Sequence, residues 1–189
     1  MDVWLASSSP RRTQLLTQLK VEHRVLLPGI DESQFEHLDP IVMVRALCVC
    51  KAKAVCERVS TGLVIAADTT VVYDNEILSK PRSKEHAIEM LSHLSGKHHK
   101  VITGVVVMDA TDKRYRLGHS VADVWLSPMT STEKEAYVAT DEPMDKAGSY
   151  SIQGQFARFV ERIDGDFYAV VGLPLAMTSR FLADLGYQF

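Results

Sequence analysis

An unbroken apolar run, Leu63-Val64-Ile65-Ala66-Ala67, is bounded by Gly62 before it and by Asp68 after it. Five consecutive apolar residues without alternation are typical of a strand that is buried on both faces at the centre of an α/β sheet. Ligands bind such sheets at the carboxyl ends of the strands, which is where Asp68 stands. Asp68 is therefore a candidate metal ligand or general base, and a hydrogen-bonded turn residue is the plain alternative.

The segments on either side of this run alternate at first between strands and helices, and strands then cluster. This order predicts a single α/β domain over residues 1–189, with a mixed twisted sheet and helices packed on its faces. The expected strands cover residues 3–6, 23–27, 63–67 with 69–73, 101–108 and 120–126, and the expected helices begin at Pro10, Pro40, Ser83 and Pro174.

Two local patterns add detail in the second half of the chain. Thr132 followed by Glu135 has the spacing of a capping box and predicts a short helix through Tyr137. Asp164-Gly165, between residues 157–163 and 167–171, predicts a β-hairpin.

The composition excludes several classes of protein. The chain has 189 residues, 46% of them hydrophobic and 24% charged, which is typical of a globular protein and not of a disordered one. Its three cysteines, Cys48, Cys50 and Cys56, lie in one short stretch, which favours reduced thiols in the cytoplasm over a disulfide scaffold. The net charge of −3 and the lack of a long apolar segment argue against nucleic-acid and membrane partners.

Hydroxyl and guanidinium groups gather where the first strand meets the first helix. Ser7-Ser8-Ser9-Pro10-Arg11-Arg12 combines the start of a helix with three hydroxyls and two arginines. Backbone N–H groups at a helix start attract anions, and arginine binds phosphate through two parallel hydrogen bonds. The alternative is a serine-capped surface helix with two solvated arginines.

Other charged groups extend this inventory. Asp31-Glu32 places two carboxylates on a loop, Lys80-Pro81-Arg82 precedes a helix, and Lys51 and Lys53 lie on the second helix. Cations that hold phosphate, together with carboxylates that hold Mg²⁺, indicate a phosphorylated substrate and phosphoryl or nucleotidyl transfer. The residues by themselves identify neither the base nor the bond that is cleaved.

The same stretches, in order along nearly the whole chain, closely resemble the Maf family of nucleoside triphosphate pyrophosphatases. They are Leu5-Ala6-Ser7-Ser8-Ser9-Pro10-Arg11-Arg12, Asp31-Glu32, Lys51-Ala52, Ala67-Asp68-Thr69, Lys80-Pro81, Leu94-Ser95-Gly96 with His99, Thr103-Gly104-Val105, Glu142-Pro143 with Asp145-Lys146-Ala147-Gly148, Tyr150 with Ile152-Gln153-Gly154, and Val170-Val171-Gly172-Leu173-Pro174.

The resemblance implies a house-cleaning enzyme that hydrolyses a nucleoside triphosphate between the α- and β-phosphates, releasing the monophosphate and pyrophosphate. By that resemblance Asp68 is the catalytic carboxylate, and Glu32 and Asp68 hold a divalent cation, Mg²⁺ or Mn²⁺. The residues implied to bind the triphosphate are Ser7, Arg12, Lys51 and Lys80.

Substrate choice in the family tracks three positions, which here are Arg11, Thr69 and Gln153. This combination is similar to that of members acting on dTTP and UTP, whereas members acting on methylated GTP carry a bulky apolar residue in place of the first arginine. The resemblance also implies a fold like that of inosine triphosphatases, with a deep nucleotide cleft and, often, a homodimer.

Two alternatives remain beside this interpretation. One is a nucleotide-sensing regulator, linked to septum formation, that binds the triphosphate and turns it over poorly. The other keeps the reaction and changes the substrate to a modified or methylated nucleotide.

Overall fold

The computed structural model describes every residue from 1 to 189. The chain forms two compact units, each assembled from segments that are separate in the sequence. Unit 1 comprises Met1–Asp68, Thr103–Ser120 and Gly172–Phe189, and unit 2 comprises Thr69–Ile102 and Val121–Val171. The prediction of one domain over residues 1–189 stays a prediction.

A mixed sheet of seven strands confirms the predicted fold class. The strands are β1 (Val3–Leu5), β2 (Arg24–Val25), β3 (Leu63–Tyr73), β4 (Glu76–Leu78), β5 (His98–Asp109), β6 (Tyr115–Leu126) and β7 (Val160–Asp164). Their order is β2-β1-β3-β5-β6-β7, with β4 paired to β3 off this path. β1 runs parallel to β2 and to β3, whereas the pairs β3–β4 and β6–β7 are antiparallel, so the sheet is mixed.

The apolar run forms the first half of β3, as predicted. Residues 63–67 are completely buried, and Val3 and Leu5 of β1 lie opposite Leu63 and Ile65. The strand continues without a break through Asp68 to Tyr73, so the two predicted extended segments are one strand. Asp68 ends the first segment of unit 1, and Thr69 begins the first segment of unit 2.

Three helices belong to unit 1, namely α1 (Pro10–Gln18), α2 (Pro40–Cys56) and α6 (Leu175–Asp184), together with the short 3-10 helix η1 (Ser33–Phe35). α2 begins as predicted, because Asp39 Oδ1 accepts hydrogen bonds from the N–H groups of Ile41 and Val42. Cys48, Ala52 and Val55 form its buried face, which packs on residues of β1, β3 and β5. This packing fixes the direction in which the other side chains of α2 point.

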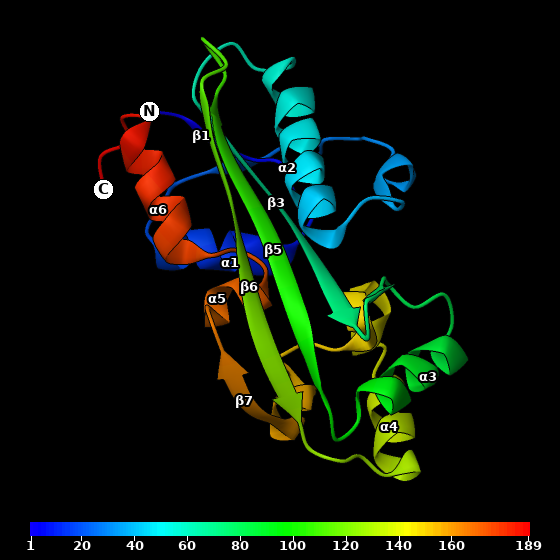
Figure 1. The fold of residues 1–189 in the computed structure, drawn as a ribbon. Helices are drawn as coiled ribbons and strands as arrows, with labels where there is room; N and C mark the ends of the chain where they lie inside the picture. The colour runs from blue at the N-terminus through cyan, green and yellow to red at the C-terminus, as the bar shows by residue number, and fades with distance from the viewer. The chain divides into compact units, whose positions relative to one another are not determined.

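Unit 2 holds the helices α3 (Lys84–Leu94), α4 (Ser131–Val138) and α5 (Phe167–Val171), and the 3-10 helices η2 (Glu142–Asp145), η3 (Ala147–Ser149) and η4 (Gln155–Phe159). α3 packs against α4 and η3, and Figure 1 shows α3 and α4 side by side. None of the helices in the chain combines the length and the apolar composition that a membrane span requires.

Two local predictions in this unit are wrong. The capping box uses Thr130 and Glu133 instead of Thr132 and Glu135, so the helix begins two residues earlier than the pattern predicted. The predicted hairpin at Asp164-Gly165 does not form, because Asp166 Oδ1 accepts hydrogen bonds from the N–H groups of Tyr168 and Ala169. That cap starts helix α5, and β7 pairs with β6 instead.

Candidate functional site

A buried lysine brings two predicted carboxylates together in unit 1. Lys51 Nζ lies 2.7 Å from Asp68 Oδ1 and 3.0 Å from Glu32 Oε1. The Lys51 side chain is 8% exposed and that of Asp68 13%, whereas Glu32 is 54% exposed. The cluster therefore has an inner ion pair, Lys51–Asp68, and an outer carboxylate that reaches solvent.

These three residues come from elements that are far apart in the sequence. Asp68 lies in β3, Lys51 in α2, and Glu32 in the loop directly before η1. Lys51 belongs to the buried side of α2, at helical spacing from Leu47 and Cys48, whereas Lys53 is exposed. That spacing is the signal that separates the buried Lys51 from the exposed Lys53 of the same helix.

The charge of Lys51 is stabilised by its partners. Burial acts to lower the pKa of the ammonium, but the opposite charge and hydrogen bond of Asp68, followed by those of Glu32, outweigh it and raise the pKa. Lys51 is therefore a permanent cation beside the Asp68 carboxylate. Removing either member of such a buried pair leaves a charge without its partner, which is strongly destabilising.

Arg12 is anchored at the beginning of α1. Its Nη1 donates to Ser7 Oγ at 3.0 Å, and its Nε donates to the carbonyl oxygen of Gly172 at 2.9 Å. Burial lowers the pKa of the guanidinium, and the charge of Asp68 opposes that shift. An arginine pKa starts so high that the group stays charged in spite of this shift.

Ser7 links the end of β1 to the first turn of α1. Its hydroxyl oxygen accepts hydrogen bonds from Arg12 and from the N–H of Ser9, while the side chain of Ser9 makes no cap hydrogen bond. Arg11, the next residue on α1, is half-buried. The helix start therefore contains a buried hydroxyl and a fixed guanidinium, as an anion-binding segment requires.

Cys48 of α2 is a buried thiol close to the ionic cluster. Burial raises the pKa of its thiol to about 12, and the charges of Asp68 and Arg12 also act on it. Gly104 lets α2 come this close to β5, since a Cβ there would lie 3.1 Å from Cys48 Sγ and 2.8 Å from the Val44 carbonyl oxygen. Cys48 is thus an un-ionised thiol in the buried interior next to the ionic cluster.

The remaining predicted residues, Thr69, Lys80 and Gln153, lie in unit 2. Thr69 is a half-buried residue of β3, and Lys80 and Gln153 are exposed. The Lys80 loop is fixed by the N–H of Gly148, which donates to the carbonyl oxygen of Ser79 at 3.4 Å. Gly148 also packs on β3, because a Cβ there would lie 3.0 Å from the methyl groups of Val71.

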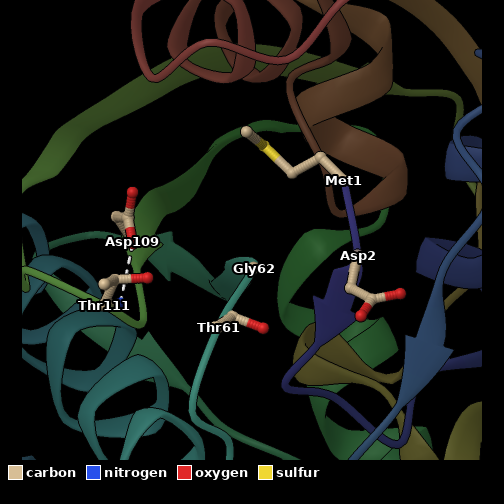
Figure 2. Close-up of a pocket in the computed structure, with 6 residues that line it drawn as sticks. All are labelled: Met1, Asp2, Thr61, Gly62, Asp109 and Thr111. Atoms are coloured by element: carbon tan, nitrogen blue, oxygen red, sulfur yellow. Dashed lines mark hydrogen bonds between the residues drawn. The ribbon is translucent and has the colours of Figure 1, made fainter.

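A cavity of about 470 Å³ in unit 1 contains none of the predicted site residues, and Figure 2 shows its lining. Gly62, which borders it, lies six residues before Asp68, or roughly 20 Å along an extended strand. Asp109 Oδ1 accepts a hydrogen bond from the N–H of Thr111 at 2.7 Å, so the Asp109 carboxylate in the cavity wall already stabilises a turn. The cavity shows no cluster of reactive groups. It is lined by Met1, Asp2, Thr61, Gly62, Asp109 and Thr111.

The carboxylates of Glu32 and Asp68 are too few to hold a metal ion by themselves. They fit an ion that is also bound by the phosphate oxygens of a substrate. No group of three or more His, Cys, Asp or Glu side chains in the chain could hold a metal ion. Glu32 and Asp68 supply two carboxylates, which is the number that Mg²⁺ uses when phosphate oxygens and water complete its shell.

The sequence is similar to those of known proteins along nearly its whole length. The sequence model of the Maf-like protein family matches residues 2–185. A dTTP/UTP pyrophosphatase of Pelotomaculum thermopropionicum is 44% identical over 187 residues, which cover 99% of this chain and 98% of that protein. A dTTP/UTP pyrophosphatase of Geobacillus sp. (strain WCH70) is 45% identical over 183 residues, which cover 97% of each chain.

A solved structure with a similar fold is the Ham1 protein of Staphylococcus aureus. The two share 13% sequence identity with a TM-score of 0.53, over 98% of this chain and 100% of that one. At this identity the likeness concerns the fold alone.

Proposed function

Because the chain belongs to the Maf-like protein family, we propose that it hydrolyses nucleoside triphosphates, dTTP and UTP foremost, to the monophosphate and pyrophosphate. The observation that carries the proposal is the pairing of Lys51 with Asp68 at the inner end of a cluster that also holds Glu32. A cation and two carboxylates at one place are the groups that phosphoryl chemistry needs.

In this proposal Asp68 acts on the attacking water. Lys51 occupies Asp68 Oδ1, so Oδ2 is the oxygen that takes up the water proton or binds a metal ion. The water oxygen forms a bond to the α-phosphorus, and the bond from that phosphorus to the oxygen bridging to the β-phosphorus breaks. The pyrophosphate leaves with that oxygen and its electron pair.

The basic groups stabilise the charge on the leaving pyrophosphate. Lys51 and Arg12 are permanent cations of unit 1, and Ser7 offers a hydroxyl beside Arg12. Lys80 of unit 2 stays a predicted contributor to triphosphate binding. Fixed cations lower the barrier because charge accumulates on the phosphate oxygens as the bond breaks.

We propose Glu32 and Asp68 as the residues that hold a divalent cation, Mg²⁺ or Mn²⁺. Such a cation, when bound, neutralises charge on the phosphate oxygens and polarises the phosphorus. The exposure of Glu32 leaves one carboxylate accessible to an ion that arrives with the nucleotide.

Base selection is assigned to Arg11, Thr69 and Gln153 in the same proposal. A glutamine amide offers a donor and an acceptor, which match the carbonyl and imide N–H of thymine or uracil. The nucleotide is then the small-molecule partner of this protein. Cytoplasmic location, the homodimer and the deep cleft stay predictions.

The test measures pyrophosphate release from a panel of natural and modified nucleoside triphosphates, first with Mg²⁺ and then with excess chelator. We expect turnover of dTTP and UTP that stops when the metal is removed. Turnover of a methylated purine nucleotide instead would overturn the assignment of the base. Nucleotide binding without any turnover would overturn the reaction and favour a nucleotide sensor.

A further inference from the structure

Gln153 is exposed, but buried residues lie close to it in the sequence on both sides. Ile152, directly before it, and Phe156, three residues after it, are part of the interior of unit 2. A flexible amide discriminates between bases only when the backbone that carries it is held in one position. The groups that hold this turn therefore bear on specificity.

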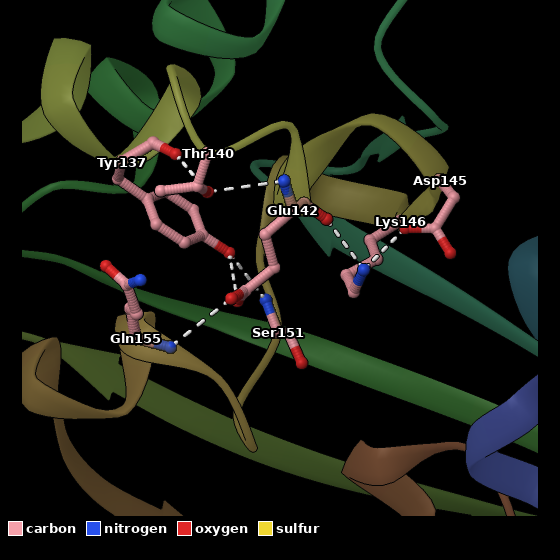
Figure 3. A network of polar contacts seen from close by, with 7 residues as sticks. All are labelled: Tyr137, Thr140, Glu142, Asp145, Lys146, Ser151 and Gln155. Carbon is pink, nitrogen blue, oxygen red and sulfur yellow. Dashed lines mark hydrogen bonds and ion pairs between the residues drawn. The ribbon is translucent and has the colours of Figure 1, made fainter.

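Two backbone N–H groups, one on each side of Gln153, donate to a single pair of side chains. The N–H of Ser151 donates to the Tyr137 hydroxyl oxygen at 3.1 Å, and the N–H of Gln155 donates to Glu142 Oε2 at 3.4 Å. The Tyr137 hydroxyl donates to Glu142 Oε1 at 2.8 Å, as Figure 3 shows. The turn is thus fixed two residues before and two residues after Gln153.

Glu142 is held through its backbone as well as its carboxylate. Its N–H donates to Thr140 Oγ1 at 3.3 Å, and its carbonyl oxygen accepts a hydrogen bond from Lys146 Nζ at 2.6 Å. The Thr140 hydroxyl donates to the carbonyl oxygen of Tyr137 at 2.6 Å, which closes a ring of contacts. Lys146 also pairs with Asp145.

Gly154 shows how closely the turn approaches this carboxylate. A Cβ at Gly154 would lie 2.1 Å from Glu142 Oε1, a separation that real atoms do not adopt. Its φ of −97° is open to any residue, so the turn conformation does not require glycine here. A side chain here would displace the Glu142 carboxylate from the hydrogen bonds that it accepts from Tyr137 and Gln155.

Tyr137 is suited to join these contacts. It is buried, and its ring packs on Phe156 with the centroids 5.0 Å apart. Burial, followed by the hydrogen bond to Glu142, raises the pKa of the phenol, so the hydroxyl keeps its proton. A neutral phenol can donate to Glu142 and accept from Ser151 at the same time.

We propose that Tyr137 and Glu142 are positioning residues for base selection, which hold the turn 151–155 so that Gln153 presents its amide in one orientation. This inference rests on the proposed function and adds two residues that act through Gln153. Neither residue is a catalytic group in this proposal.

The first variant is Tyr137→Phe, which removes the hydroxyl and keeps the ring on Phe156. We expect kcat/KM for dTTP to fall about tenfold, the scale of one hydrogen bond, while kcat/KM for GTP stays within twofold. The ratio of the two values measures selectivity. Tyr115→Phe is the matched control, because Tyr115 is 46% exposed and lies in unit 1.

A double-mutant cycle with Gln153→Ala separates positioning from a merely structural role. In the Gln153→Ala background, Tyr137→Phe is expected to leave the selectivity ratio unchanged, because the amide that it positions is gone. An equal loss for dTTP and GTP, or a further loss of selectivity in that background, would overturn the proposal.

Glu142→Gln provides a second variant if Tyr137→Phe does not fold. It places an amide where two donors need a carboxylate, and we expect the same loss of selectivity, with Glu135→Gln on the exposed side of α4 as its control. A wild-type protein that hydrolyses no nucleoside triphosphate would overturn the proposed function together with this inference. A wild-type protein that prefers dTTP, with variants of unaltered selectivity, would overturn the inference alone.

Discussion

The Lys51–Asp68–Glu32 cluster of unit 1 and the Tyr137–Glu142 pair of unit 2 are both polar and partly buried, but they are built differently. The first joins full charges from α2, β3 and a loop. The second joins a phenol, a carboxylate and backbone N–H groups within residues 137–155. The ionic cluster forms only when α2 packs on the sheet. The Tyr137–Glu142 pair forms within one stretch of chain, residues 137–155.

Because of this difference, we expect mutations in the two regions to have effects of different size. A missing partner in the ionic cluster leaves a buried charge unpaired, so damage is large and reaches the reacting groups. A missing hydrogen bond in the turn shifts the backbone that carries Gln153, so the loss of activity is smaller and affects the selectivity between nucleotides.

Asp68→Asn is expected to have the largest effect. The amide keeps the shape of the carboxylate but does not take up a proton, so we expect kcat for dTTP to fall about a thousandfold. Pyrophosphate release at saturating nucleotide measures it. The control is Asp2→Asn, an exposed carboxylate of the same unit, and equal activity of the two variants would contradict the role of Asp68.

Lys51→Met is expected to lower the free energy of unfolding by about 3–5 kcal/mol, because Asp68 loses the partner of a buried ion pair. Denaturant unfolding measures the change. Lys53→Met, on the exposed side of α2, should change stability by no more than about 0.5 kcal/mol. Similar losses in both variants would show that the Lys51 pair does not stabilise unit 1.

Acid is expected to destabilise the protein through His99 of unit 2. Burial lowers the pKa of His99 from 6.5 to about 4, so the unfolded chain binds this proton more readily than the folded protein does. The contribution of the neutral His99 to the free energy of unfolding is then complete above pH 6.5 and is lost as the pH falls from 6.5 to about 4. Its full size is about 3 kcal/mol.

Urea unfolding of wild type and of His99→Gln across that range measures this contribution. The variant should lose less stability on acidification than wild type, whereas His98→Gln, at an exposed ring, should follow wild type. His99 Nε2 lies 2.6 Å from the Tyr150 hydroxyl, and its Nδ1 is buried without a hydrogen-bond partner. The charge of Asp123 favours the imidazolium but does not outweigh the effect of burial. Parallel pH curves for wild type and His99→Gln would contradict the prediction.

Gly154→Ala is expected to cost about 1–3 kcal/mol, because the new Cβ and the Glu142 carboxylate cannot occupy the same space. Thermal unfolding measures the loss. The matched test is the same substitution in a Glu142→Ala background, where the obstructing carboxylate is absent and the added cost should nearly vanish. An undiminished cost there would place the strain elsewhere.

Thr130→Ala is expected to have the smallest effect, about 1 kcal/mol, because the cap of α4 is lost. Thr132→Ala, in the exposed first turn of the same helix, should change stability by only a few tenths of a kcal/mol. The comparison tests which of the two overlapping patterns caps the helix. A larger loss from Thr132→Ala would contradict the observed register.

The sequence predicted those parts of the fold that local signals determine. The buried half of β3 and the start of α2 at Asp39-Pro40 both depend on adjacent residues. The start of α4 differs from the prediction because two capping patterns overlap, and the cap that forms is that of Thr130 with Glu133. Asp166 likewise competes with the Asp164-Gly165 turn signal and starts α5.

The candidate site was foreseen in its residue types more than in its contacts. Helical spacing could have placed Lys51 on the buried side of α2, but its pairing with Asp68 depends on the packing of α2 against the sheet. The Tyr137–Glu142 contact could not be predicted, because it depends on the path of the chain through η2 and η4. Both contacts depend on tertiary packing, which no short sequence pattern encodes.

Product analysis during hydrolysis of dTTP by the wild-type protein shows which phosphorus atom the water attacks. We expect dTMP and pyrophosphate in equal amounts, with orthophosphate appearing only after an inorganic pyrophosphatase is added. Release of orthophosphate together with dTDP would contradict this expectation, because the attack would then be on the terminal phosphate.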